Sequence, residues 1–252
     1  MSQVSPHVEY ILRLGDNALI LGQRLSEWCG HGPVLEQDIA VTNIALDLIG
    51  QARTLLDYAG RLEGKGRNDD ALAFLRDAGC FRNVLLVEQP NEDWAYTFAR
   101  QFFFDVFHFN LHQELLHSRD RELAAIAEKA IKEVTYHLRF SSEWVIRLGD
   151  GTETSHQKMQ DAVDDLWVFT GEMLTSDAID RQMLAEGIGA DLDRIRTQWE
   201  ATVDAILKEA TLSKPSAIWM QSGGKAGRHS EHLGYILADM QFLQRAYPGN
   251  EW

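Results

Sequence analysis

Cysteine and proline are both scarce in this sequence. Only two of its 252 residues are cysteines, Cys29 and Cys80, which excludes a disulfide framework and suits a reducing, cytoplasmic setting. The chain has five prolines, and none lies between Pro90 and Pro215. A chain of strands and turns would rarely run so far without proline, whereas long helices with short connections would. These absences favour an all-α protein.

Basic residues are also few, because 24 Lys and Arg stand against 38 Asp and Glu, for a net charge of −14. A surface of this sign repels phosphate backbones and anionic headgroups, so we expect no nucleic-acid partner and no membrane. No apolar run reaches transmembrane length, and residues 1–7 lack the basic and apolar regions of a signal peptide. The prediction is a soluble, cytoplasmic protein.

Apolar residues recur at steps of three and four, which is typical of helices. The expected helices cover residues 8–28, 36–62, 71–77, 92–118, 121–148, 152–174, 191–212 and 231–246. Asn91 is the expected N-cap of the helix over 92–118. With 45% hydrophobic residues, the chain can bury a sizeable core. We therefore predict one domain over residues 1–252, built on four long helices with additional helices after them.

Large helical bundles often hold two iron ions, bound by a Glu from each of two helices and a Glu-x-x-His from each of the other two. Residues three apart share a helix face, so this spacing brings a carboxylate and an imidazole to one ion. No Glu-x-x-His stands in the setting that this pattern needs. Asp47 is followed by Gly50 at the third position, and Glu133 by Tyr136. His137 comes one step late, which favours a hydrogen-bonded or partly exposed Glu133–His137 pair over a metal site.

Other motifs for chemistry are weak. His108, His112 and Glu114 suggest a ligand group, but Phe109 stands where His-Glu-x-x-His has its glutamate, which favours core or interface histidines. The stretch Ser222-Gly223-Gly224-Lys225 lacks the spacing and the preceding strand of a phosphate-binding loop. No Gly-x-Ser-x-Gly supports nucleophilic catalysis.

The helix over 92–118 carries more aromatic rings than one buried face needs. Phe102, Phe103 and Phe104 are consecutive and cover about 200° of the helix circumference. A helix that is apolar nearly all round is buried by neighbouring helices or by another chain. We therefore predict that this helix takes part in a subunit interface, with burial in the core of its own chain left open, and Phe103 is the position that distinguishes the two.

Several stretches together resemble one known family. They are Leu14-Gly15-Asp16-Asn17, Glu27-Trp28-Cys29-Gly30-His31, residues 43–53, residues 85–90, residues 132–139 and the ending over residues 231–245. They resemble the C subunits of the bacterial ring 1,2-phenylacetyl-CoA epoxidase, a multicomponent monooxygenase of aerobic phenylacetate breakdown. The resemblance covers nearly the whole chain and rests on the set, since no single stretch is specific.

The resemblance implies a ferritin-like four-helix bundle and a place in a complex. In that complex the catalytic A subunit holds a di-iron centre, the B subunit is small, and a reductase holds flavin and an iron–sulfur centre. The complex depends on oxygen and NADPH. The C subunit shares the fold of the A subunit, has lost the metal ligands and holds no cofactor. It pairs with A, stabilises it and helps to frame the phenylacetyl-CoA site, while a homodimer is left open.

The resemblance also implies substrate-binding residues, and no catalytic ones, in this chain. They are Cys80, Phe81, Arg82, Asn83, Arg181, Gln182 and Met183. Arg82 and Arg181 could pair with the CoA phosphates, and Phe81 could stack on adenine. From the residues alone, both arginines are equally consistent with solvated surface charges.

Two functions of other classes stay open at this point. One is an independently active ferritin-like di-metal oxidoreductase, against which the broken Glu-x-x-His spacing argues. The other is a helical scaffold unrelated to oxygenation, against which the family stretches argue.

We predict that the purified chain binds no stoichiometric iron. Two irons need about six protein ligands, whereas Gly50 and Tyr136 stand where imidazoles are required. Elemental analysis after aerobic purification without chelator measures the iron content. About two irons per chain would contradict the prediction.

Overall fold

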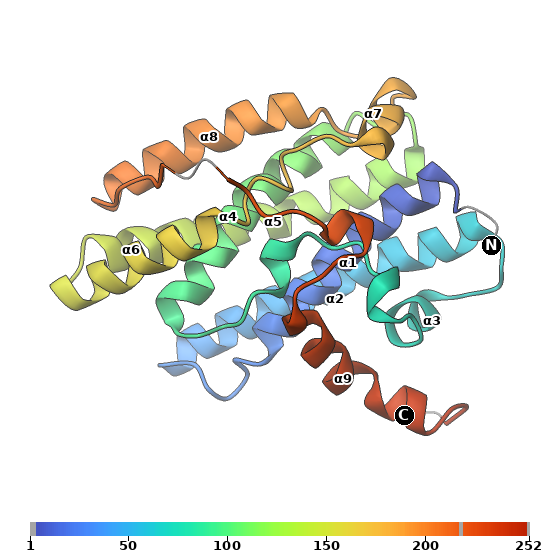
Figure 1. Ribbon diagram of the computed structural model, residues 1–252, viewed down its shortest axis with the longest axis horizontal. Helices are drawn as coiled ribbons and strands as arrows, with labels where there is room; N and C mark the ends of the chain where they lie inside the picture. The colour runs from blue at the N-terminus through green and yellow to red at the C-terminus, as the bar shows by residue number, and fades with distance from the viewer. Residues whose placement is uncertain (1–3, 217–218, 251–252) are drawn as a thin grey trace. The chain divides into compact units, whose positions relative to one another are not determined.

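The computed structural model describes residues 4–216 and 219–250, which are helical and contain no strand (Figure 1). The long helices are α1 (Pro6–Ser26), α2 (Leu35–Glu63), α4 (Trp94–Leu115) and α5 (Arg121–Gly149). The shorter elements are α3 (Asp69–Phe74), η1 (Ala78–Cys80), η2 (Leu85–Glu88), α6 (Glu153–Trp167), α7 (Ala178–Ala185), α8 (Leu192–Glu209), η3 (Gly224–Ala226) and α9 (Glu231–Ala246). The predicted all-α, ferritin-like fold class with additional C-terminal helices is confirmed.

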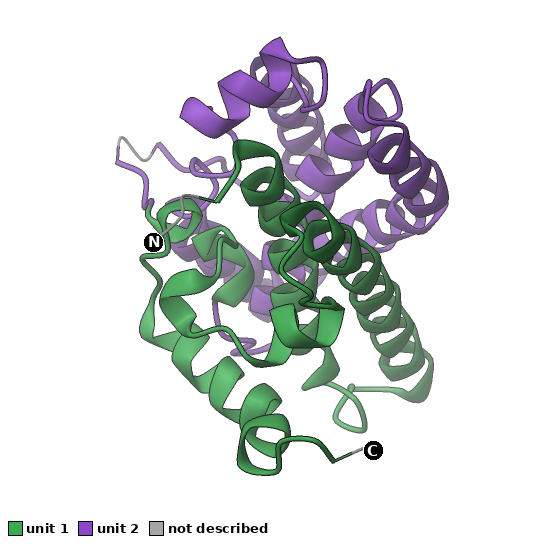
Figure 2. Cartoon of the chain, turned by 90° about the vertical axis from the view of Figure 1, so that its right-hand side faces the viewer, with its two compact units in different colours: residues 1–88, 223–252 green, residues 89–222 purple. Residues whose placement is uncertain are grey.

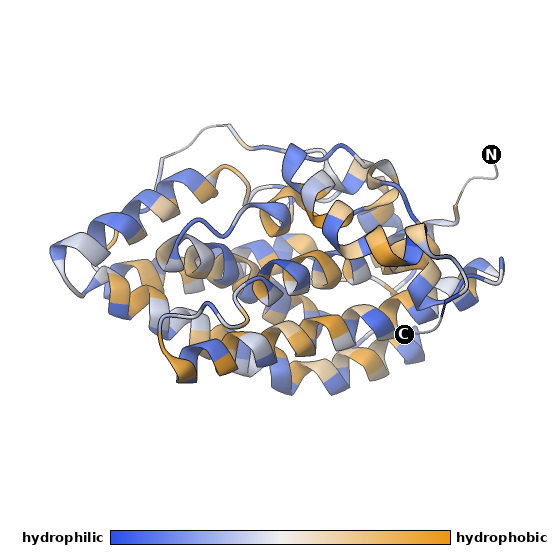
Figure 3. Cartoon of the chain, turned by 90° about the horizontal axis from the view of Figure 1, so that it is seen from below, coloured by the Kyte–Doolittle hydropathy of each residue, from blue (hydrophilic) through white to orange (hydrophobic). Residues whose placement is uncertain are grey.

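Each helix carries both apolar and polar residues (Figure 3). Short polar side chains cap the N-termini of most of the described α-helices. The predicted N-cap at Asn91 is wrong by two residues. Asp93 caps α4 instead, accepting a hydrogen bond from the Tyr96 amide at 3.0 Å. Asn91 is engaged elsewhere, because its side chain accepts from Arg100 at 2.7 Å. Among the described residues, every helix is too short or too polar to span a bilayer.

By its internal packing the chain divides into two compact units (Figure 2). Unit 1 comprises residues 1–88 and 223–252, and unit 2 comprises residues 89–222. Each unit contains one pair of the long helices, α1 with α2 and α4 with α5. The single domain expected over residues 1–252 stays a prediction.

In unit 1, α1 and α2 pack closely and antiparallel. A Cβ atom on Gly15 would lie 3.0 Å from Leu56, and one on Gly22 would lie 3.1 Å from Ile49. The partners move back along α2 as the glycines move forward along α1, so the two helices run in opposite directions. The absence of side chains at these positions lets the two backbones approach.

In unit 2, α4 is the central helix, and it explains the aromatic excess. Phe102, Phe103 and Phe104 are at most 1% exposed. The Phe103 ring lies 5.6 Å from that of Trp167 on α6 and 5.9 Å from that of Trp199 on α8. Helices of the same unit therefore cover this face, so Phe103 lies in the core and not at a subunit interface. A helix that is apolar all round looks the same in sequence whether its own chain or another covers it.

Phe103 should therefore behave as a core residue. Phe103→Ala should lower the free energy of unfolding by about 3–5 kcal/mol, the range for an emptied aromatic site. Phe103→Glu should unfold the chain, because an unpaired buried charge is costly. Urea denaturation measures the free energy of unfolding of Phe103→Ala, and circular dichroism shows whether Phe103→Glu is folded. Phe242→Ala, at a side chain that is 61% exposed, is the matched control and should be nearly neutral. A folded Phe103→Glu monomer would contradict this placement.

Candidate functional site

The stretch from Gly79 to Glu88 follows α3 with only short 3-10 turns, so its main chain needs other partners. Side chains of α1 supply them. The Arg82 amide donates to Asp16 Oδ2 at 2.8 Å, and the Val84 amide donates to Asn17 Oδ1 at 2.8 Å. Arg24 donates to the Glu88 carbonyl oxygen from Nε and Nη2, at 3.2 and 3.1 Å. Arg24 follows Asp16 and Asn17 by about two helical turns, so the three side chains form one polar stripe along α1.

A buried ion pair fixes the start of this stretch. Asp16 receives both Nη groups of Arg76, and the two side chains are 0% and 4% exposed. Arg76 also donates to the Cys80 carbonyl oxygen at 3.1 Å, and its guanidinium carbon lies 4.2 Å from the centre of the Phe81 ring. Removing either partner would leave a buried charge uncompensated, which costs about 3–5 kcal/mol.

A second buried carboxylate, Glu88, fixes the end of the stretch. Its side chain is fully buried and accepts three hydrogen bonds, from Asn83 Nδ2 at 2.9 Å, His229 Nδ1 at 2.9 Å and the Ser230 amide at 2.6 Å. Burial disfavours the charged imidazole, but the hydrogen bond and the charge of Glu88 outweigh it and raise the pKa of His229.

The loop that carries His229 lies directly against the stretch. A Cβ atom on Gly224 would overlap the Asn83 carbonyl oxygen, and one on Gly227 would overlap that of Gly79. Gly227 also has φ +76°, a conformation that other residues rarely adopt. The glycines of the Ser222-Gly223-Gly224-Lys225 region therefore serve close packing against residues 79–83.

The structure places the predicted residues 80–83 at the centre of this network. Cys80 is exposed, whereas Phe81 and Asn83 are fully buried. Phe81 packs under Arg76 and presents no free face, so the expectation that it stacks on adenine does not fit this structure. Arg82 donates from Nε to Glu9 at 2.6 Å and from Nη1 to the Phe81 carbonyl oxygen at 2.7 Å. It is therefore an anchored side chain rather than a freely solvated one.

The other predicted residues lie on α7, a helix that the apolar spacing did not predict. Arg181 and Gln182 are exposed, whereas Met183 is 1% exposed. Arg181 donates from Nη1 to the Ser176 carbonyl oxygen at 3.0 Å, which leaves its other donors open to a ligand. Residues 80–83 belong to unit 1 and residues 181–183 to unit 2, so the structure groups each set only within its own unit.

The positions where metal-binding imidazoles were sought face outward. Gly50 is exposed, and Tyr136 is 37% exposed. Next to these positions, the buried pairs three residues apart are Leu48 with Gln51 on α2 and Val134 with His137 on α5. The inward register is therefore one residue later than the sequence pattern indicated. In this register each helix has an aliphatic side chain where Glu-x-x-His has its carboxylate.

The core of unit 2 holds a polar cluster around Asp105 of α4. Gln101 Nε2 donates to Asp105 Oδ1 at 2.7 Å, and His137 of α5 lies close enough to interact with its charge. Burial raises the pKa of Asp105 to about 7, against the opposing effects of His137, Ser141 and Gln101.

The histidines next to this cluster are core residues, as the sequence favoured. The His108 and His112 rings are 4.4 Å apart, and His112 Nδ1 lies 2.9 Å from the His108 carbonyl oxygen. Burial lowers the pKa of His108 well below its usual value and that of His112 to about 4. Glu114 is engaged elsewhere, accepting from Arg194 at 3.2 Å. In the described part of the chain, no group of three or more His, Cys, Asp or Glu could hold a metal ion.

Two Glu-x-x-His sequences do occur, at Glu114–His117 and Glu153–His156, but each lies at a helix end. The His156 ring is hydrogen-bonded to the Gly149 carbonyl oxygen at 2.6 Å. Together with the single buried carboxyl group of the α4–α5 cluster, these residues do not fit a di-iron centre. The absence of metal from this chain stays a prediction that the iron assay tests.

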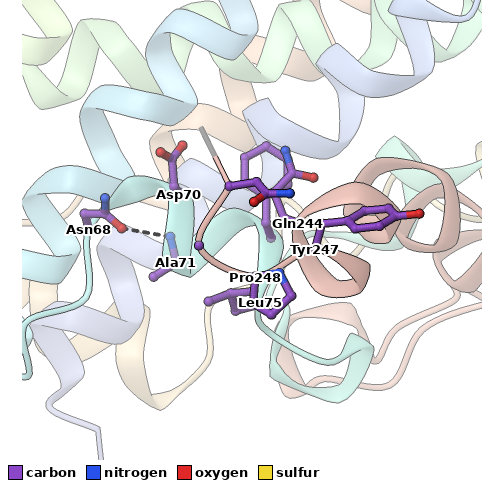
Figure 4. Close-up of a pocket in the computed structure, with 10 residues that line it drawn as sticks. Asn68, Asp70, Ala71, Leu75, Gln244, Tyr247 and Pro248 are labelled. Carbon is purple, nitrogen blue, oxygen red and sulfur yellow. Dashed lines mark hydrogen bonds between the residues drawn. The ribbon is translucent and has the colours of Figure 1, made fainter. Parts of the chain in front are cut away.

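A hollow lies between α3 and the end of α9 in unit 1 (Figure 4). Its lining includes Asn68, Asp70, Leu75, Gln244 and Tyr247, and the Asn68 side chain there accepts from the Ala71 amide at 2.9 Å. None of the predicted site residues lines it. The candidate site is therefore the 80–83 segment with its network.

The long helices and the absence of strands in the described residues define an all-α, ferritin-like helical protein. The chain matches the family described as "Phenylacetic acid catabolic protein" over residues 2–252, and it belongs to that family. A curated relative from Escherichia coli strain K12, the C subunit of 1,2-phenylacetyl-CoA epoxidase, is 55% identical over 243 residues. These residues are 96% of this chain and 98% of the relative. The resemblance identified from the sequence stretches is confirmed.

Asp105→Asn should stabilise the chain at pH 8 more than at pH 4. The pKa of Asp105 is about 7 in the folded chain, so the folded chain binds more protons than the unfolded chain between pH 4 and pH 7. Stability therefore falls as pH rises through this window. Asparagine keeps the acceptor for Gln101 without the charge, and the gain at pH 8 should be on the order of 4 kcal/mol.

Urea denaturation at both pH values measures this difference. Asp164→Asn is the matched control, because Asp164 accepts from Gln160 at the same spacing on the exposed face of α6. It should change stability little at either pH. A loss of stability in Asp105→Asn at pH 8 would mean that the carboxyl group is ionised and well paired.

Proposed function

We propose that this chain is a non-catalytic subunit of a phenylacetyl-CoA 1,2-epoxidase complex in aerobic phenylacetate catabolism. It pairs with the di-iron catalytic subunit, stabilises it and helps to frame the CoA-thioester site. The near-complete match to a protein named as the C subunit of that enzyme supports a role in the complex. The observation that carries the non-catalytic role is that, next to the positions with Glu-x-x-His-like spacing on α2 and α5, the buried residues are Leu48 with Gln51 and Val134 with His137, and neither pair contains a carboxylate.

The partners follow from the same proposal. They are the di-iron A subunit, the small B subunit, and a reductase with flavin and an iron–sulfur centre, all in the cytoplasm, with oxygen and NADPH consumed by the complex. A homodimer is a second arrangement, but the burial of Phe103 removes the reason for placing its interface on α4. The altered ligand set disfavours an independent di-metal oxidoreductase, and the family match disfavours an unrelated scaffold.

The two arginines differ in how they could bind CoA phosphates. Arg82 is already paired with Glu9, so a phosphate there would compete with a carboxylate. Arg181 has a main-chain partner and lies exposed on α7, where a guanidinium can pair with a phosphate in bidentate fashion. Because the chain carries −14 overall, such local positive charge matters for an anionic substrate. We therefore assign the larger share of phosphate binding in this chain to Arg181.

Reconstitution of the complex tests the proposed role. The chain should co-purify with the di-iron subunit when both are expressed together. Omission of the chain should abolish or sharply reduce epoxidation of phenylacetyl-CoA, because the catalytic subunit loses its support. The chain with the reductase alone should form no product. Full activity without this chain, or product from it without the di-iron subunit, would overturn the proposal.

Arg181→Ala should raise KM for phenylacetyl-CoA in the assembled complex and leave kcat unchanged, because a phosphate contact is uniform between ground and transition states. The loss of one charged hydrogen bond costs about 1.5–3 kcal/mol, or about 10- to 150-fold in affinity, and we expect the lower end. Arg82→Ala should have a smaller effect. Arg194→Ala, at an exposed arginine of α8, is the control. An unchanged KM in both variants would make the role purely structural.

A further inference from the structure

His229 joins two segments that are far apart in the sequence. Its Nδ1 lies 2.9 Å from Glu88 Oε2, and its Nε2 lies 3.1 Å from the Phe81 carbonyl oxygen. The side chain is 4% exposed, so water does not replace these partners easily. The imidazole is therefore the direct link between the loop before α9 and the 80–83 segment.

The chemistry of these partners fixes the protonation state of His229. A carbonyl oxygen can only accept, so Nε2 must carry a hydrogen. Both Glu88 oxygens also accept from other N–H groups, those of Asn83 and Ser230, as an ionised carboxylate would. Nδ1 must then carry a hydrogen as well. Both ring nitrogens are donors only in the imidazolium form.

Several charged residues lie on the elements next to His229. They are Asp16 and Arg24 on α1, Arg76 after α3, Arg82 and Glu88 on the stretch over 79–88, and Glu231 and His232 on α9. Asp16 is paired with Arg76, and Arg82 with Glu9. The carboxylate of Glu88, hydrogen-bonded to His229, therefore makes the most direct charge contact.

We propose that His229, as an imidazolium, is a positioning residue that locks the 80–83 segment into the conformation that receives the acyl-CoA thioester. The inference rests on the proposed function, because it takes residues 80–83 as part of the substrate site. Loss of the proton removes one of the two hydrogen bonds, since neutral imidazole has a single N–H. The segment then loosens, and the affinity for the thioester falls.

The sign of the pH dependence follows from the linkage. The pKa of His229 is raised above the ordinary value of about 6.5. The lock is therefore complete below about pH 6.5 and is lost as pH rises through the higher pKa of the folded chain. Substrate affinity should thus weaken on the alkaline side of neutrality.

The first experiment uses the full chain alone and does not depend on the proposed function. The histidines are labelled with ¹³C, and their resonances are followed by NMR from about pH 5 to pH 10, a range that brackets ordinary histidine titration. His229→Gln assigns the resonance. A midpoint clearly above 6.5 supports the lock. A midpoint at or below that value would overturn it.

The second experiment uses the assembled complex with phenylacetyl-CoA as the probe. His229→Gln should raise KM about tenfold at neutral pH, as expected for one lost charged hydrogen bond, with kcat within twofold. In the wild-type complex KM should rise with pH, and in the variant this dependence should flatten. The wild-type profile keeps the test valid even where the variant folds poorly.

His232→Gln is the matched control, because this half-buried histidine also lies at the start of α9 but is not part of the Glu88 network. It should keep the wild-type KM and pH profile. An active complex whose KM is unchanged by His229→Gln would overturn the lock and leave the proposed function standing. A complex fully active without this chain would instead overturn the proposed function, while the NMR midpoint still tests the charge on His229.

Discussion

The fully buried carboxylate of Glu88 is the interaction on which the candidate site depends. It accepts hydrogen bonds from Asn83, His229 and the Ser230 amide, and so draws together parts of the chain about 140 residues apart. A charge without water must find such partners or become neutral. The same constraint operates at Asp16, whose partners are Arg76 and the Arg82 amide. Between these two carboxylates, an irregular segment obtains the hydrogen bonds that a helix would have supplied.

In unit 1, different interactions provide the stability of the helix pair and the course of the irregular segment. The antiparallel packing of α1 and α2 provides the apolar burial, whereas the polar stripe of α1 specifies where residues 79–88 run. Under the proposed function, rigidity of that segment favours substrate binding, because a preorganised site loses less conformational entropy on binding. In unit 2, by contrast, the buried polar cluster around Asp105 occupies a core that the related metal-binding pattern would fill with carboxylates. Under the proposed function, the chain keeps the helical frame and supports the complex rather than carrying out oxygen chemistry.

The sequence was sufficient for the helices but not for the side-chain register. Residues 231–246 were predicted within a residue, since apolar spacing and polar caps are local signals. Motif spacing placed Gly50 of α2 and Tyr136 of α5 at the positions of metal-binding imidazoles. The buried residues of the two helices are one position later, at Gln51 and His137. The interface at Phe103 failed for a similar reason, because periodicity does not say which chain covers a face. The hydrogen bonds of Glu88 to His229 and Ser230 could not be predicted from the sequence, because these residues are about 140 positions apart.

The most direct test of this account is hydrogen exchange in the full chain with Glu88→Gln. The glutamine NH2 group would replace one carboxylate oxygen and face either the Ser230 amide or the Asn83 and His229 donors, so the three contacts cannot all survive. We predict that the amides of Arg82, Val84 and Ser230 exchange at least about tenfold faster, while exchange in α4 and α5 is unchanged. Glu143→Gln, at an exposed carboxylate of unit 2, should alter none of these amides. Unchanged exchange at all three amides in Glu88→Gln would contradict the claim that this buried carboxylate holds the site together.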